Sequence, residues 1–126
     1  MVPQQTLVDS PRRVLVVEDE ALIRALLAEE LRDNGLTVIE ARTADEAKAY
    51  LEAGNSVDLV FSDIRMPGSM SGVALARHLR SQDPFLPIIL SSAYPGMESI
   101  EGIGPFLKKP YQITAAVGLV LKLLGL

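Results

Sequence analysis

Cysteine is absent from the 126 residues, and histidine occurs once, as His78. Without cysteine the chain has no disulfides, no zinc-thiolate site and no thiol nucleophile. A single histidine does not build a metal cluster. The missing cysteines are compatible with a reducing compartment, and a composition that is 48% apolar is enough for one domain with its own core.

An excess of positive charge and long apolar runs are also missing. The net charge of −4 argues against binding nucleic acid through bulk charge. The most apolar stretch, "AAVGLVLKLLGL", contains Lys122 and is far shorter than the roughly 20 residues that cross a bilayer. Residues 1–11 lack the features of a secretory signal and predict a flexible tail before a domain over 12–126. We therefore expect a cytoplasmic protein without nucleic-acid or membrane partners.

Short apolar runs alternate with helical patterns along the whole chain, which is typical of βα units around a parallel sheet. Runs such as "VLVV" and "IIL" do not alternate with polar residues, as expected when helices cover both faces of the sheet. The expected strands are Arg13–Val17, Thr37–Glu40, Asp58–Ser62, Pro87–Ser91 and Phe106–Lys108.

Helical patterns fill the intervals between these strands. The first ends at an Asn-Gly pair suited to a C-cap, and the second opens on the capping box "TADE". The expected helices run from about Glu20 to Asp33, Thr43 to Ala53, Ser71 or Gly72 to Ser81, and Gln112 to Leu124. Between Ala93 and Phe106, three glycines and two prolines leave room for two helical turns at most. We expect a mobile loop with a short helical fragment there, and hence a reduced fourth helix.

Polar side chains gather where the predicted strands end. In open parallel sheets, ligands lie beyond the carboxyl ends of the strands. The residues found there are Glu18, Asp19, Glu20, Asp63, Ser92 and Lys109. Each taken alone has an ordinary structural explanation, as a helix-start anion, a turn residue or a solvated lysine. Taken together, crowded carboxylates raise one another's pKa, and a hard cation such as Mg²⁺ relieves the crowding.

The same groups suit phosphoryl transfer. An aspartate carboxylate can act as nucleophile and become an acyl phosphate. A metal and a lysine then neutralise the phosphoryl oxygens, while a hydroxyl donates a hydrogen bond to them. No general base is placed to drive turnover on an outside substrate. We therefore expect stable modification of Asp63, with at most self-phosphorylation and self-dephosphorylation, and no conventional turnover enzyme.

The stretches "VLVVEDE", "DLVFSDIRMPG", "PIILSSA" and "FLKKPY" occur in this order and together resemble the receiver domain of two-component response regulators. The resemblance runs from about Arg13 to the end of the chain. It implies an α/β, flavodoxin-like, doubly wound sheet of five parallel strands in the order 2-1-3-4-5. It also implies a phosphorelay module that takes a phosphoryl group from a histidine kinase or phosphotransfer protein and then changes its surface for a downstream protein partner.

The resemblance also implies a role for each site residue. Asp63 corresponds to the phosphoacceptor and Lys109 to the family's lysine, with a cis bond to Pro110. Glu18, Asp19, Asp63 and the backbone carbonyl of Arg65 correspond to the Mg²⁺ ligands, with Asp19 a direct one. Ser92 corresponds to the hydroxyl that meets the phosphoryl group, and Ser92 and Phe106 form the switch pair. Glu18 replaces the more usual aspartate, and the loop "MPGSMSG" is one residue longer than usual.

The last helix carries more leucine than one buried face needs. Leu119 and Leu123 are expected on its outer side, where they would form a partner interface or a weak homodimer. We expect no output domain. The alternative functions are a pseudo-receiver that only binds proteins and a haloacid-dehalogenase-like phosphatase. The phosphatase needs a second acid where Arg65 stands, and a flavin site is disfavoured because the first loop is acidic.

Overall fold

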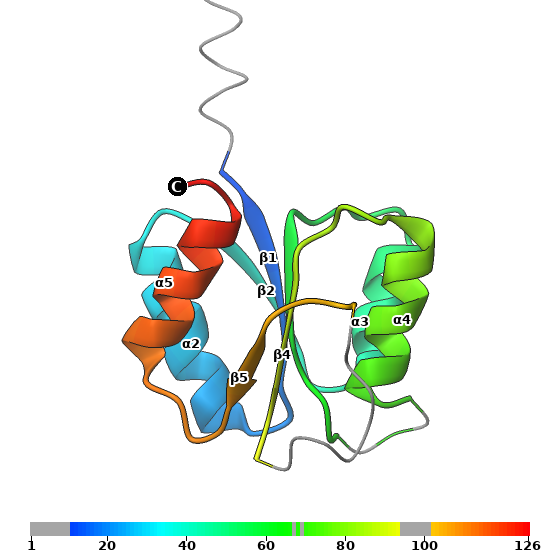
Figure 1. Cartoon of the computed structure of the whole chain (residues 1–126), viewed down its shortest axis with the longest axis horizontal. Helices are drawn as coiled ribbons and strands as arrows, with labels where there is room; N and C mark the ends of the chain where they lie inside the picture. Colours follow the sequence, from blue (N-terminus) through cyan, green and yellow to red (C-terminus); the bar gives the residue numbers. More distant parts are fainter. Residues whose placement is uncertain (1–10, 67, 69, 94–101) are drawn as a thin grey trace, which may run out of the picture.

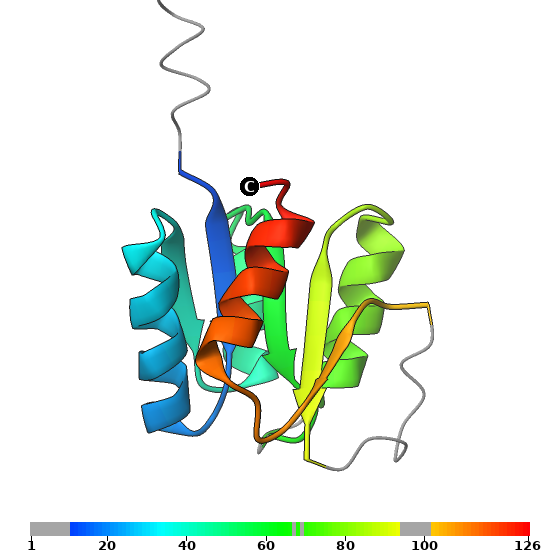
Figure 2. The same ribbon diagram turned by 60° about the vertical axis from the view of Figure 1, so that its left-hand side comes forward.

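The computed structural model describes residues 11–66, 68, 70–93 and 102–126. Within them, five parallel strands form one sheet in the order β2-β1-β3-β4-β5, which confirms the predicted order. The strands are β1 (Arg13–Val17), β2 (Thr37–Ala41), β3 (Leu59–Asp63), β4 (Ile88–Ser92) and β5 (Phe106–Lys108). Because all strands run the same way, their carboxyl ends meet at one edge of the sheet, the lower edge in Figures 1 and 2.

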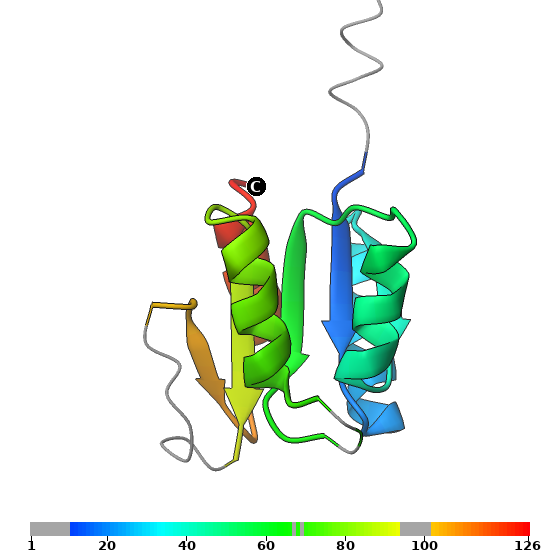
Figure 3. The same ribbon diagram turned by 90° about the vertical axis from the view of Figure 1, so that its right-hand side faces the viewer.

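Helices cover both faces of this sheet. The pair α2 (Ala21–Asp33) and α5 (Ile113–Leu123) covers one face, and the pair α3 (Ala44–Glu52) and α4 (Gly72–Gln82) covers the other (Figure 1). Figure 3 presents the α3/α4 layer from its own side. Each face has its own apolar cluster: Val14 and Val16 of β1 belong to the first, and Leu15 and Val17 to the second. Burial on both faces explains the unbroken apolar runs.

Helix ends follow the predicted caps. The Thr43 hydroxyl accepts a hydrogen bond from the backbone N–H of Glu46 at 3.1 Å, and the Glu46 carboxylate accepts one from the backbone N–H of Arg42 at 3.0 Å. The first helix gives way to Gly35, whose φ of 86° suits glycine. These local signals place the helix boundaries close to the predicted ones.

The start of α4 lies against the end of β3. A Cβ atom added at Gly72 would lie 1.9 Å from the carbonyl oxygen of Asp63, so only glycine fits this approach. The Gly72 N–H also donates to the Ile64 carbonyl at 3.0 Å, and the Ser71 hydroxyl caps the helix by accepting from the Ala74 N–H at 3.1 Å. The close packing of α4 therefore holds the backbone around Asp63.

The predicted loop with its short helical fragment and its mobility falls mostly on residues 94–101, which lie outside the described residues. So do residues 1–10 of the tail predicted over residues 1–11. The described residues between β4 and β5 contain no helix. Ile103 is buried in the α3/α4 cluster, and its carbonyl accepts a hydrogen bond from Arg80. None of the helices in the described part of the chain is long and apolar enough to span a membrane.

The outer side of α5 is less exposed than the sequence predicts. Leu119 and Leu123 are half-buried and pack against the α2/α5 cluster instead of standing free. The reason is that α5 packs on α2 as well as on the sheet, so more than one stripe of the helix is covered. Their part in a partner interface stays a prediction.

Candidate functional site

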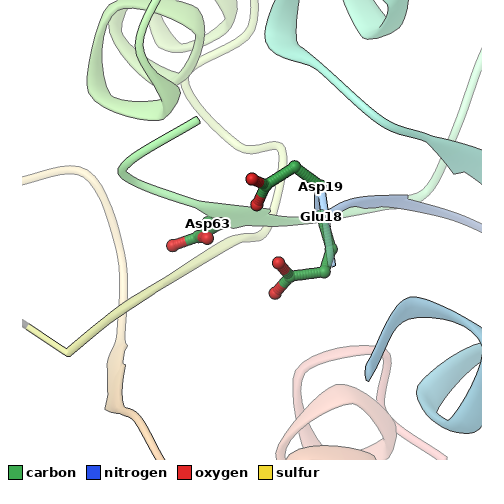
Figure 4. Close-up of side chains that lie close together, drawn as sticks. All are labelled: Glu18, Asp19 and Asp63. Atoms are coloured by element: carbon green, nitrogen blue, oxygen red, sulfur yellow. The ribbon is translucent and has the colours of Figure 1, made fainter. Parts of the chain in front are cut away.

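Three carboxylates meet at the carboxyl ends of neighbouring strands. Glu18 and Asp19 directly follow β1, and Asp63 is the last residue of β3, whose Ser62 lies beside Val17 of β1. One carboxylate oxygen from each acid lies within 4.8 Å of the others (Figure 4). Glu18 and Asp63 are only 3% and 5% exposed, whereas Asp19 is open to solvent.

Lys109 supplies the positive charge among these acids. Its Nζ lies 2.7 Å from Oε1 of Glu18, 3.1 Å from Oδ2 of Asp63 and 3.5 Å from Oε1 of Glu20. The lysine follows β5 directly; its backbone N–H donates to the Ser92 carbonyl at 3.0 Å, and its bond to Pro110 is cis, as the resemblance implied. Of the two adjacent lysines, Lys109 is therefore the one that the fold directs into the acidic cluster.

Burial dominates the electrostatics of the acids. It raises the pKa of Glu18 to about 7, although hydrogen bonds from Lys109 and the Glu20 N–H act in the opposite direction. Burial also raises the pKa of Asp63, against hydrogen bonds from Lys109 and the Arg65 backbone N–H. Burial lowers the pKa of Lys109, but its hydrogen bonds to Glu18 and Asp63 outweigh this and raise the pKa overall. One ammonium thus leaves the carboxylates only partly compensated.

This donor set fits a hard divalent cation. All its ligand atoms are carboxylate oxygens, they lie close together, and they carry more negative charge than Lys109 neutralises. Mg²⁺ takes oxygen ligands, needs only one or two carboxylates and keeps several waters. The exposed Asp19 and the less accessible Glu18 and Asp63 would hold it.

A cavity of about 170 Å³ adjoins the acids and collects the other predicted groups. Its walls include Asp63, Lys109, Arg65 and Ser92. Ser92 is brought there by β4, in which the preceding residue, Ser91, pairs with Asp63. Carboxylate, ammonium and hydroxyl therefore border the same space, as the strand-end argument predicts.

Phe106, the other member of the predicted switch pair, lies apart from this cavity. It pairs with Leu90 in the sheet and packs half-buried against the α3/α4 cluster. Ser92 and Phe106 thus belong to neighbouring strands, and among the described residues only Ser92 of this pair lines the 170 Å³ cavity. Their coupling stays a prediction.

A second, larger cavity of about 460 Å³ lies beside the first and shares Glu20, Ala93 and Lys109 with it. Its remaining walls are mostly apolar, from Ile23, Leu26, Pro110, Tyr111 and Ile113. We call it the apolar cavity.

Leucines of α2 extend the apolar surface around this cavity, and the sequence pattern did not reveal them. Leu22 is 72% exposed and Leu26 46% exposed, whereas Leu27 and Leu31 are buried. Leu22 and Leu26 therefore lie outside the buried face of α2. Their spacing of four residues was the available signal, since it forms a second stripe beside the buried one.

Two further side chains next to the acids were also missed. Arg24 donates to the backbone carbonyl of Glu18 at 2.8 Å. Tyr111 packs on Phe61 with ring centroids 5.7 Å apart, and burial, helped by the charge of Glu18, raises the pKa of Tyr111 to about 12. No local sequence pattern marks either residue, because both contacts join separate elements of the fold.

Comparison with known proteins gives a consistent result. The family model for the response regulator receiver domain matches residues 14–117. The DNA-binding transcriptional regulator NtrC of Salmonella typhimurium is 37% identical over 112 residues, which cover 85% of this chain and 24% of that protein. The transcriptional regulatory protein PdtaR of Mycobacterium tuberculosis is 37% identical over 110 residues, covering 82% of this chain and 52% of that protein.

Solved structures agree in fold. The response regulator protein TrrA from Thermotoga maritima, in complex with Mg²⁺-BeF, is 36% identical with a TM-score of 0.77, and the match covers 89% of this chain and 98% of that one. The receiver domain of the hybrid histidine kinase CckA is 33% identical with a TM-score of 0.75, covering 89% and 98%. The chain spans about a quarter of the length of the NtrC relatives that it matches.

Proposed function

Because the chain belongs to the response regulator receiver domain family, we propose that Asp63 accepts a phosphoryl group from a histidine kinase or phosphotransfer protein. The observation that carries the proposal is the position of Lys109, whose ammonium lies 3.1 Å from the buried Asp63 carboxylate at the mouth of a cavity that Ser92 also lines. This arrangement supports a nucleophile, a counter-charge and a hydrogen-bond donor acting on one incoming group.

The transfer itself forms one bond and breaks one. An oxygen of Asp63 attacks phosphorus, and the bond from phosphorus to the donor's imidazole nitrogen breaks, with its electron pair leaving on that nitrogen. The product is an acyl phosphate on Asp63. The Lys109 ammonium then forms an ion pair with one phosphoryl oxygen, and the Ser92 hydroxyl donates a hydrogen bond to another.

Mg²⁺ is the cofactor that we propose, with Glu18, Asp19, Asp63 and the Arg65 carbonyl as the groups that would hold it. When bound, it supplies additional positive charge for the phosphoryl oxygens. The oxygen-only donor set supports this choice.

Acetyl phosphate provides a test that needs no partner protein. Incubated with acetyl phosphate and Mg²⁺, the wild-type chain should gain the mass of one phosphoryl group in an intact-mass measurement, and Asp63→Asn should gain none. Uptake by Asp63→Asn at the wild-type rate contradicts the assignment. A folded wild-type chain that takes up no phosphoryl group, in the presence or absence of Mg²⁺, favours the alternative of a pseudo-receiver that only binds proteins.

The apolar cavity supports docking of a protein donor beside the acceptor. It shares Lys109 and Glu20 with the smaller cavity beside the acids, and Leu22 and Leu26 expose apolar surface next to it. We expect Leu26→Glu to slow transfer from a phosphorylated donor protein while leaving uptake from acetyl phosphate unchanged. Phe85→Glu is the matched control, because Phe85 is 89% exposed but precedes β4, at the opposite edge of the sheet. Equal transfer rates for both variants contradict the docking site.

The consequences of phosphorylation are proposed on the β5/α5 side. Ser92 and Phe106 would change there together, and the altered surface would bind a downstream protein or a second copy through Leu119 and Leu123. A cytoplasmic location and the lack of a nucleic-acid partner stay predictions.

A further inference from the structure

Arg24, near the start of α2, holds the backbone on which the acidic pair stands. Its side chain is 14% exposed, and its guanidinium has two partners. One NH group donates to the Glu18 carbonyl oxygen at 2.8 Å, and Nε donates to Oε1 of Glu40 on β2 at 3.2 Å. The fork of the guanidinium thus links the end of β1 to the neighbouring strand.

The other polar groups of Glu18 have partners in the sheet or the site, whereas its carbonyl is held by Arg24 in the described part of the chain. The Glu18 N–H donates to the Ala41 carbonyl at 3.0 Å, and the carboxylate accepts from Lys109 and from the Glu20 N–H at 3.1 Å. The carbonyl belongs to the planar peptide that joins Glu18 to Asp19. Fixing this plane therefore fixes the point from which the Asp19 side chain leaves the backbone.

Asp19 depends on this backbone more than its neighbours do. Its side chain is exposed, and within the described ranges it has no hydrogen bond and no ion pair. Glu18 and Asp63, in contrast, are both held by Lys109. We propose that Arg24 is a positioning residue for cation binding, acting through the Glu18 peptide on the direction of Asp19. This inference rests on the proposed function, because it takes Glu18 and Asp19 to be Mg²⁺ ligands.

Arg32 offers a matched comparison on the same helix. It donates to the same carboxylate, at 3.2 Å to Oε2 of Glu40, and to one backbone carbonyl, that of Val38, at 2.9 Å. The Val38 carbonyl lies within β2, away from the acidic pair. Arg24 and Arg32 therefore make the same kinds of contact, and only Arg24 touches the site.

The charge of Arg24 and its positioning role predict opposite effects on Mg²⁺ affinity when Arg24 is removed. A cation beside the acids repels Mg²⁺, so its removal would tighten Mg²⁺ binding if its charge were the dominant effect. If positioning dominates, removal weakens binding, and loss of a residue that orients a metal ligand typically costs about 10- to 100-fold in affinity. Arg24→Lys keeps the charge but loses the two-pronged geometry, so it should also bind more weakly than wild type.

The experiment is a calorimetric Mg²⁺ titration of the whole chain, without any phosphoryl donor, together with urea unfolding of each variant. We expect Arg24→Met to bind Mg²⁺ about tenfold more weakly than wild type, Arg24→Lys to lie between them, and Arg32→Met to match wild type. A role limited to stability would instead lower the unfolding free energy of Arg24→Met and leave its Mg²⁺ affinity unchanged, while the half-exposed Arg32, 49% exposed against 14% for Arg24, should lose less stability.

Each outcome decides one question. Wild-type affinity or tighter binding in Arg24→Met overturns the positioning role. If Arg24→Met does not fold, Arg24→Lys decides: weaker binding supports the role, and unchanged binding overturns it. A wild-type chain with no saturable Mg²⁺ binding instead contradicts the proposed metal site, and so the failure of the proposed function is distinguished from the failure of this inference.

Discussion

Replacing Lys109 with methionine should destabilise the metal-free protein strongly. The ammonium forms ion pairs with Glu18 at 2.7 Å and Asp63 at 3.1 Å, and both carboxylates are almost fully buried. Removing one partner of a buried ion pair costs roughly 3–5 kcal/mol, because the remaining charge is left uncompensated. Here the pKa of Glu18 is already raised to about 7, so proton uptake relieves part of the cost. We therefore expect a loss of about 3 kcal/mol, at the lower end of that range.

The measurement is urea unfolding at neutral pH, with and without Mg²⁺. Added Mg²⁺ should restore part of the stability of Lys109→Met, since a ligand at 100 times its Kd contributes about 2.7 kcal/mol. The Kd of Lys109→Met for Mg²⁺ should be lower than that of the wild type, because the ammonium that competes with Mg²⁺ for the carboxylates is gone. Lys108→Met is the control, since Lys108 is exposed on β5 and surface substitutions usually stay within about 0.5 kcal/mol. Equal metal-free urea midpoints for Lys109→Met and wild type would refute the reasoning.

Further predictions concern two glycines and two leucines. Gly72→Ala would place a Cβ 1.9 Å from the Asp63 carbonyl oxygen, so we expect a loss of about 1–3 kcal/mol in urea unfolding and slower phosphoryl uptake; a wild-type midpoint would contradict this. Gly118→Ala lies in the middle of α5, where the described part of the chain places nothing within 4 Å of the new methyl group apart from the helix's own backbone and the adjacent residues, and it should instead stabilise by up to about 1 kcal/mol. Leu119→Glu/Leu123→Glu should be more monomeric than wild type in sedimentation across the micromolar range; monomers in both cases exclude a dimer interface there.

The residues that gather at the strand ends could be predicted from the sequence alone. Each of the acids, Ser92 and Lys109 directly follows or ends an apolar run, and parallel strands bring such positions to one edge. The structure brings Glu18, Asp19, Asp63 and Lys109 together as predicted. The local caps and turns also gave the limits of the helices, because these signals depend only on residues a few positions apart.

The spacing of apolar residues in the sequence could not predict features that depend on how the helices rotate and pack. With leucines on more than one stripe of α2 and α5, periodicity alone left the rotation of each helix open, and it did not mark Leu22 and Leu26 as exposed. The half-burial of Leu119 follows from the packing of α5 on both α2 and the sheet. The contact of Arg24 with Glu40 joins a helix to a strand sixteen positions away, and no local spacing encodes it.

The most direct test of Asp63 as phosphoacceptor identifies the modified residue itself. After incubation with acetyl phosphate and Mg²⁺, borohydride reduces an aspartyl phosphate to homoserine, and peptide mass spectrometry then locates the change. We predict homoserine at position 63 in the wild-type chain, dependent on Mg²⁺, and wild-type Asp19 unchanged. Reduction at another carboxylate, or an unmodified Asp63 in protein that carries the phosphoryl mass, would contradict the assignment.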